Sequence, residues 1–170
     1  MRQLIEGAGL PSREDAQRGF DHGTFVPLAL MFPEADVPVV SLALNSSLDP
    51  LEHLKLGEAL GPLRDEGVLI MGSGLSYHNL RNFGPAAGPV AEQFGGWLTE
   101  AATDADPQSR SRKLIDWRKA PSARAAHPRE EHLIPLMVAA GAAGPDRGRT
   151  AFEDTVWGVK MISYGFGLSQ

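Results

Sequence analysis

Residues 37–72 read VPVVSLALNSSLDPLEHLKLGEALGPLRDEGVLIMG, and no other stretch of the chain carries so clear a pattern. Its two ends, 37–44 and 68–72, are short, apolar and rich in β-branched side chains, as buried strands are. Between them, Asp49 and Pro50 are typical of a helix start. Apolar residues then recur at helical spacing, at Leu56, Ala59, Leu60 and Leu63. Strand, helix and strand in this order predict a βαβ unit with parallel pairing. We therefore expect an α/β fold with a mostly parallel or mixed central sheet flanked by helices.

The segments around this unit carry weaker patterns. Residues 88–102 and 129–144 are predicted to be helical, and 156–168 has strand character. Residues 104–113, DADPQSRSRK, are polar throughout and are the most loop-like stretch. No repeat or linker divides the chain, so residues 1–170 are expected to form a single domain.

Composition and charge exclude several classes of protein. The 170 residues are 42% hydrophobic and 22% charged, which is typical of a globular domain. The net charge of −5 and the lack of a dense basic cluster argue against nucleic acid or an anionic membrane as partner. The chain has no cysteine, which excludes thiolate metal sites and suits a reducing compartment. With no apolar run long enough to span a bilayer and no secretory signal, a cytoplasmic location is expected.

His78 lies in GSGLSYHNL (72–80), directly after the predicted strand 68–72. In α/β sheets, ligands bind outside the carboxyl ends of the strands, so His78 is a candidate for a reactive centre. The alternative is a loop histidine that bonds to its own backbone. The segment does not match the G-x-S-x-G elbow of hydrolases or a G-x-G-x-x-G phosphate loop. A hydrolase using Ser73 or Ser76 with His78 is therefore a minor alternative.

His132 lies in HPREEHLIPL (127–136). His127 precedes it by five residues, about 140° around a helix, so the two do not share a helical face. A metal ligand at His132 therefore needs partners from elsewhere in the chain. The neighbouring Glu130 and Glu131 are explained by the dipole of the predicted helix, which favours acids in a first turn.

Two more histidines have distinct contexts. His22, in GFDHG (19–23), is flanked by glycines that permit a close approach, and Asp21 is a candidate to orient its ring. A plain turn histidine is an equally good interpretation. His53 lies in the first turn of the predicted helix and is expected to be a partly covered helix histidine without a functional role.

Three segments in order resemble one family, the class III extradiol ring-cleavage dioxygenases. They are RGFDHGTFVPLALMFPEADVPVV (18–40), LRDEGVLIMGSGLSYHNLRNFG (63–84) and APSARAAHPREEHLIPLMVAAGAAG (120–144). The resemblance is to the LigB-like branch of 4,5-DOPA-type dioxygenases. It extends in order from about residue 1 to the C-terminal ISYGFG.

The resemblance implies a LigB-like α/β fold and a single non-haem metal, Fe²⁺ or Zn²⁺. It implies a catechol, such as DOPA, and O₂ as partners, with ring opening by insertion of dioxygen. On the matching motifs, His78 and His132 fall at the metal centre. His78 is then either a metal ligand or the acid/base that handles the catechol proton, and His22 lines the substrate pocket. His127 receives no role.

The sequence departs from the family pattern in one respect. Members of the family carry a G-H-G-[SA]-P segment and an S-A-H-W segment, which supply two further metal histidines. Neither segment occurs in this sequence. The chain is therefore expected to be the C-terminal two-thirds of a family domain that lacks its N-terminal strands. An exposed strand edge and apolar face would then favour homo-oligomer formation. The alternative function is an inactive remnant that acts as a binding or assembly partner.

Overall fold

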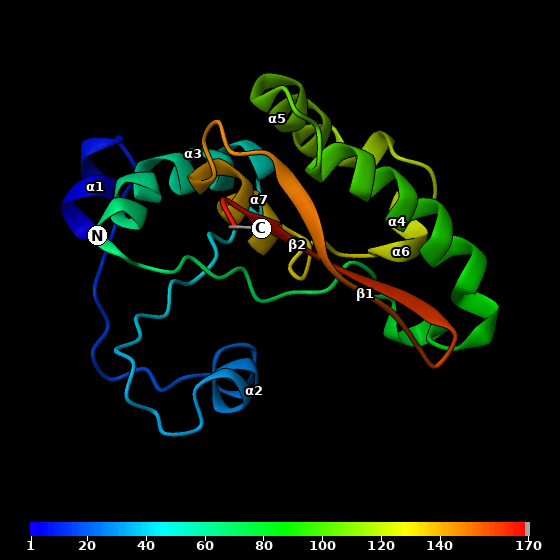
Figure 1. Ribbon diagram of the computed structural model, residues 1–170, viewed down its shortest axis with the longest axis horizontal. Helices are drawn as coiled ribbons and strands as arrows, with labels where there is room; N and C mark the ends of the chain where they lie inside the picture. The colour runs from blue at the N-terminus through cyan, green and yellow to red at the C-terminus, as the bar shows by residue number, and fades with distance from the viewer. Residues whose placement is uncertain (169–170) are drawn as a thin grey trace.

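The structure, a computed structural model, describes residues 1–168 and is mostly helical (Figure 1). No helix in this part of the chain is long and apolar enough to cross a membrane. The α-helices are α1 (Arg2–Gly7), α2 (His22–Met31), α3 (Pro50–Leu60), α4 (Gly88–Ala102), α5 (Pro107–Ile115), α6 (Ala123–Ala126) and α7 (Ile134–Ala142). Short 3-10 helices are η1 (Gly61–Glu66), η2 (Leu80–Asn82), η3 (Pro85–Ala87) and η4 (Trp117–Lys119). The strands are β1 (Gly148–Val156) and β2 (Val159–Phe166).

Strands β1 and β2 form an antiparallel hairpin that crosses the front of the molecule in Figure 1. The register pairs Val156 with Val159 at the turn. Strand β2 packs on α4, where Val159 and Ile162 are buried and Thr99 bonds the Tyr164 hydroxyl at 3.0 Å. The strand character predicted for 156–168 is therefore confirmed in β2, and α4 has the bounds that the sequence predicted.

The predicted parallel sheet is wrong for this chain. Residues 37–44 and 68–72 run as extended segments without strand pairing, and no backbone hydrogen bond joins them within the described residues. Their apolar side chains are open to solvent, since Val40 is 72% exposed and Leu69 is 63% exposed. The apolar pattern indicates that a segment suits burial on two faces, but a strand also needs a hydrogen-bonded neighbour, and residues 1–168 supply none.

Helix α3 forms between these segments as predicted, but only Leu60 of the predicted apolar face is buried, and Leu56 and Ala59 are half-buried. The Asp49 side chain accepts the Glu52 N–H at 2.9 Å and caps the helix. The buried face runs through Leu54, Gly57 and Leu60 and lies against α7. The two helices approach closely because a Cβ at Gly57 would lie 2.1 Å from the Val138 carbonyl oxygen. Gly141 of α7 is equally tight, as a Cβ there would lie 2.1 Å from the carbonyl oxygen of Leu54.

Two helical expectations need correction. The polar stretch 104–113 is not a loop, because Asp106 caps α5 by accepting the Gln108 and Ser109 N–H groups. Its buried residues, Arg110 and Leu114, are four positions apart and face the core, which the overall polarity of the segment concealed. Helix α7 is shorter than the predicted 129–144, since residues 129–133 form turns and Pro135 lies in its first turn.

A charged cluster fixes the turn that leads into α7. The buried Glu130 carboxylate accepts hydrogen bonds from Arg118 and, at 2.7 Å, from Arg124. The Arg124 guanidinium also lies over the Trp117 ring at 4.8 Å. Burial alone would raise the pKa of Glu130, but the two arginines outweigh it and lower the pKa to about 2. The main chain that precedes α7 is therefore anchored to η4 and α6.

The close approach of α3 and α7 predicts that Gly57→Ala destabilises the fold. The added methyl group must push the helices apart, and overpacking of this kind costs about 1–3 kcal/mol. The matched control is Gly96→Ala on α4, where a Cβ meets no atom within 4 Å, and which should be neutral or stabilising through helix propensity. Chemical denaturation of both variants measures the difference. Equal stability of Gly57→Ala and the parent protein would contradict the packing.

The Glu130 cluster predicts acid-sensitive stability. Because the folded pKa is depressed, the contribution is complete above the unfolded pKa of 4.5 and is lost as the pH falls towards about 2. Glu130→Gln should lose on the order of 2 kcal/mol of unfolding free energy at neutral pH. Its stability should also fall less than that of the parent between pH 5 and 2. Glu100→Gln, at an exposed position on α4, is the control. A Glu130→Gln curve parallel to that of the parent would refute the assignment.

Candidate metal centre

The GSG turn brings the predicted site together by pressing against the start of α7. A Cβ at Gly74 would lie 2.2 Å from the His132 carbonyl oxygen, and one at Gly72 would lie 2.5 Å from that of Pro135. Only glycine permits backbones to lie this close. The Leu75 N–H then donates to the His132 carbonyl at 2.9 Å. These glycines therefore serve a close approach between two segments rather than a phosphate-binding turn.

His78 and His132 meet as a result. Their imidazole rings stack with centroids 3.5 Å apart and planes inclined by 25°. Both side chains are half-buried. The backbone N–H of His78 donates to the Ala126 carbonyl at 3.0 Å, and the Asn79 side chain donates to the Ala125 carbonyl at 2.8 Å. Two histidines that lie 54 positions apart in the sequence are thus held in direct contact.

Glu131 completes a group of three potential metal ligands. One ligand atom each from His78, Glu131 and His132 lies within 4.8 Å of the other two. The Glu131 Oε2 atom is buried and accepts no hydrogen bond from the described residues, although the Arg129 Nε lies 3.3 Å away as an ion pair. A buried carboxylate oxygen without a hydrogen bond beside two imidazoles fits a divalent cation. Two histidines and one carboxylate are the ligand set of many non-haem iron oxygenases, which keep coordination positions open.

Glu131 was missed by the sequence reasoning, which explained it by a helix dipole. That explanation is wrong because α7 begins at Ile134, so Glu131 lies in the preceding turn. Two features of the sequence could have revealed Glu131. It lies directly before His132 in E-E-H, and Pro135 is typical of the first turn of a helix, which would have placed Glu131 before the helix.

The electrostatics favour the neutral, metal-binding form of His132. Burial is the largest cause that lowers the pKa of His132, and positive charge on His78 lowers it further, while Glu131 opposes the shift. A neutral imidazole has a free nitrogen lone pair for a metal.

His22 lies near this group but outside it. It is the first residue of α2, its side chain is exposed, and its charge contributes weakly to the lowered pKa of His132. The start of α2 also approaches the GSG turn, since a Cβ at Gly23 would lie 3.6 Å from the Ser73 Oγ. Asp21 does not orient the His22 ring as the sequence suggested. It instead caps α2 by accepting the Thr24 N–H at 3.2 Å.

The remaining histidines have structural environments. His53 is buried, and both its ring nitrogens are used, by the Asn45 N–H at 3.1 Å and the Asp49 carbonyl at 2.7 Å. His53 is therefore a helix histidine with a structural environment, as expected, but it is fully rather than partly covered. His127 is fully buried and bonds the Ser76 carbonyl at 3.1 Å. Burial lowers the pKa of His127 to about 4.

The serine hydrolase alternative finds no support in the geometry. Ser76 is buried, and its Oγ accepts the N–H of Ile162 at 2.9 Å. That hydroxyl is therefore committed to holding β2 against the loop. Ser73 lies beside the start of α2 and has no hydrogen bond to a histidine among the described residues.

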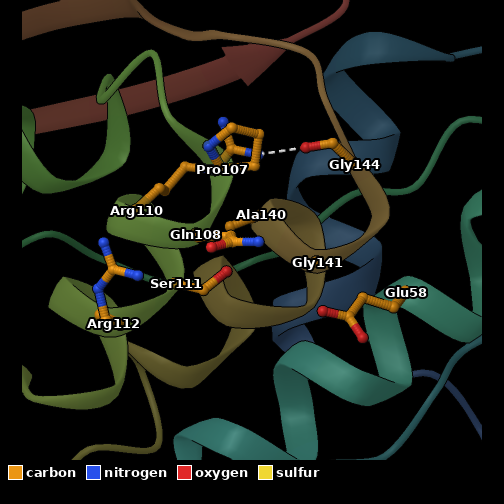
Figure 2. A pocket seen from close by; sticks show the side chains of 9 residues that line it. All are labelled: Glu58, Pro107, Gln108, Arg110, Ser111, Arg112, Ala140, Gly141 and Gly144. Atoms are coloured by element: carbon orange, nitrogen blue, oxygen red, sulfur yellow. Dashed lines mark hydrogen bonds between the residues drawn. The ribbon is translucent and has the colours of Figure 1, made fainter.

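A separate hollow of about 530 Å³ lies between α3, α5 and α7 (Figure 2). Glu58, Ser111 and Gly141 are on its walls. It lies towards the C-terminal end of α7, whereas His132 precedes the start of that helix. Its buried cation, Arg110, is engaged by the carbonyls of Gly144 and Asp146.

Comparison with known proteins identifies relatives of this chain. The family model described as the catalytic LigB subunit of aromatic ring-opening dioxygenase matches residues 1–167. A 4,5-DOPA dioxygenase extradiol from Beta vulgaris is 42% identical over an alignment of 169 residues, and the alignment covers 97% of this chain and 62% of that protein. A protein of the same description from Portulaca grandiflora is 40% identical, over 95% of this chain and 59% of its own length.

The fold is shared with a solved structure as well. The crystal structure of an uncharacterized protein from Escherichia coli K12 matches with a TM-score of 0.81 and 29% identity. The match covers 95% of this chain and 69% of that one. The chain spans about three-fifths of the length of the curated plant relatives. Because the family model covers nearly the whole chain, this protein belongs to the LigB family of aromatic ring-opening dioxygenases.

Proposed function

We propose that this chain carries part or all of an extradiol ring-cleavage site, which inserts O₂ into a catechol at a mononuclear non-haem metal. The observation that carries the proposal is the convergence of His78, Glu131 and His132 within 4.8 Å. Relatives described as 4,5-DOPA dioxygenases support DOPA or a related dihydroxy-aromatic as substrate. Family membership supports the reaction class.

His132 and Glu131 are the residues that we assign to the metal, with His78 as the third ligand or as the acid/base. The ligand types suit Fe²⁺, and they also suit Zn²⁺. When bound, the metal supplies a Lewis-acidic centre that can hold a catecholate and dioxygen together. Two or three protein ligands leave coordination positions open for both reactants.

His78 is also suited to proton transfer. An imidazole nitrogen can accept a proton and donate it again, so the His78 ring can take up a catechol proton and return it to the opened product. Its backbone bond to Ala126 fixes the main chain while the ring remains half-buried at the site. Whether His78 ligates or transfers the proton is decided by the metal affinity of His78→Ala, which falls in the first case and persists in the second.

His22 is proposed to contact the substrate. It lies at the start of α2, next to the GSG turn, and its ring is open to solvent. An exposed imidazole at the margin of a metal centre can bond a catechol oxygen without occupying a coordination position. This role separates it from the metal-binding group.

Metal titration tests the ligand group. The chain should bind Zn²⁺ or Co²⁺ as one ion per chain, in competition with a chromophoric chelator. Glu131→Gln and His132→Ala should each weaken binding by more than about 100-fold, because loss of a direct ligand costs more than loss of a residue that only hydrogen-bonds to a ligand. Glu100→Gln and His22→Ala, which leave the group intact, should bind as the parent does. Unchanged affinity in Glu131→Gln and His132→Ala would remove the proposed centre.

Ring opening is tested with the Fe²⁺-loaded protein in air. DOPA or protocatechuate should give the yellow absorbance of a ring-opened semialdehyde. His22→Ala should lower kcat/KM by about 100-fold while metal affinity is retained, as expected for loss of a positioned proton or hydrogen-bonding group. A metal-loaded protein that binds catechol and stays colourless would contradict the dioxygenase and favour the alternative, an inactive assembly partner.

A further inference from the structure

His127 is a buried histidine that the metal group does not use. Its side chain is 0% exposed, and it lies between α6 and the turn that carries Glu131 and His132. The Phe94 ring meets it edge-on at 5.2 Å and the Trp117 ring at 6.2 Å. These aromatic neighbours fix the plane of the imidazole.

The ring makes one hydrogen bond, and that bond reaches the loop of His78. The Nε2 atom lies 3.1 Å from the carbonyl oxygen of Ser76, two residues before His78. Because a carbonyl can only accept, Nε2 carries the proton and donates. In return, the His78 N–H donates to the carbonyl of Ala126, the residue before His127. The two segments are therefore joined by a reciprocal pair of bonds.

The second ring nitrogen of His127, Nδ1, is buried and has no hydrogen-bond partner among the described residues. A buried unpaired acceptor is unfavourable. A phenylalanine would fill an aromatic slot between Phe94 and Trp117 without that cost. The N–H donated to Ser76 is thus the property that distinguishes histidine at this position.

We propose that His127 is a positioning residue, whose bond to the Ser76 carbonyl holds residues 75–79 so that the His78 ring stays stacked on His132. In this stack, the His78 and His132 rings lie together beside Glu131. The consequence for metal binding rests on the proposed function, whereas the consequence for the His78 ring does not.

The test uses a matched pair of substitutions in the full chain. His127→Gln keeps an N–H near the position of Nε2, and His127→Met has the same length without a donor. His127→Phe keeps the ring and removes the donor. Phe94→Leu loosens the same aromatic cage but leaves the bond intact, and it serves as the control for a purely structural effect.

The first readout needs no metal. Nuclear magnetic resonance should show that His78 and His132 lose their mutual ring-current shifts in His127→Met and His127→Phe. The Leu75 and His78 amides should also exchange faster in these variants. His127→Gln and Phe94→Leu should retain both features. Unchanged His78 ring signals and amide exchange in folded His127→Met or His127→Phe would overturn the proposal.

The second readout is Co²⁺ binding. His127→Met should bind Co²⁺ about 10–100-fold more weakly and with an altered visible absorption spectrum, as for loss of a group that orients a ligand. His127→Gln should recover most of the affinity and the spectrum. If the parent chain binds no Co²⁺ while His127→Met still disturbs the His78 ring, the proposed metal function fails and the positioning role stands. If the parent chain binds Co²⁺, equal Co²⁺ spectra and affinities for His127→Met and the parent would overturn the positioning role of His127.

Discussion

The candidate site depends on one close contact, between the GSG turn and the carbonyls at the start of α7. Gly74 approaches His132 so closely that any side chain would displace the segment, and the Leu75 N–H then bonds the same carbonyl. From that contact the chain leads in four residues to His78. The stacked imidazoles follow from this backbone contact together with the His127–Ser76 bond that we propose to hold residues 75–79, and no direct attraction between the two rings is needed to explain them.

The rest of the fold keeps the start of α7 in place. At one end, the Glu130 carboxylate ties the preceding turn to Arg118 and Arg124. Along the helix, Gly57 and Gly141 let α3 and α7 pack backbone to backbone. At the other end, Arg64 donates to the last carbonyls of α7. Glu131 and His132 therefore lie in a turn between a charged cluster and a tightly packed helix.

Several elements followed from local rules in the sequence. Helix α3 begins where Asp49 and Pro50 predicted, since capping is decided within one turn. The proximity of His78 and His132 came from the family resemblance, and the structure shows them in contact. The prediction of paired strands at 37–44 and 68–72 was wrong because an apolar pattern indicates only that a segment suits burial, whereas strand pairing depends on a hydrogen-bonded neighbour. Glu131 was missed because the start of α7 was placed too early.

The most direct test of the account is a crystal structure of the chain soaked with Zn²⁺, with anomalous data collected at the zinc edge. We expect one anomalous peak in contact with His132 and Glu131. His78 should either bind the zinc ion directly or lie within hydrogen-bond reach of a water molecule bound to it. A zinc ion bound elsewhere with this group empty, or no peak in crystals whose His78 and His132 rings are stacked, would contradict the proposed metal centre.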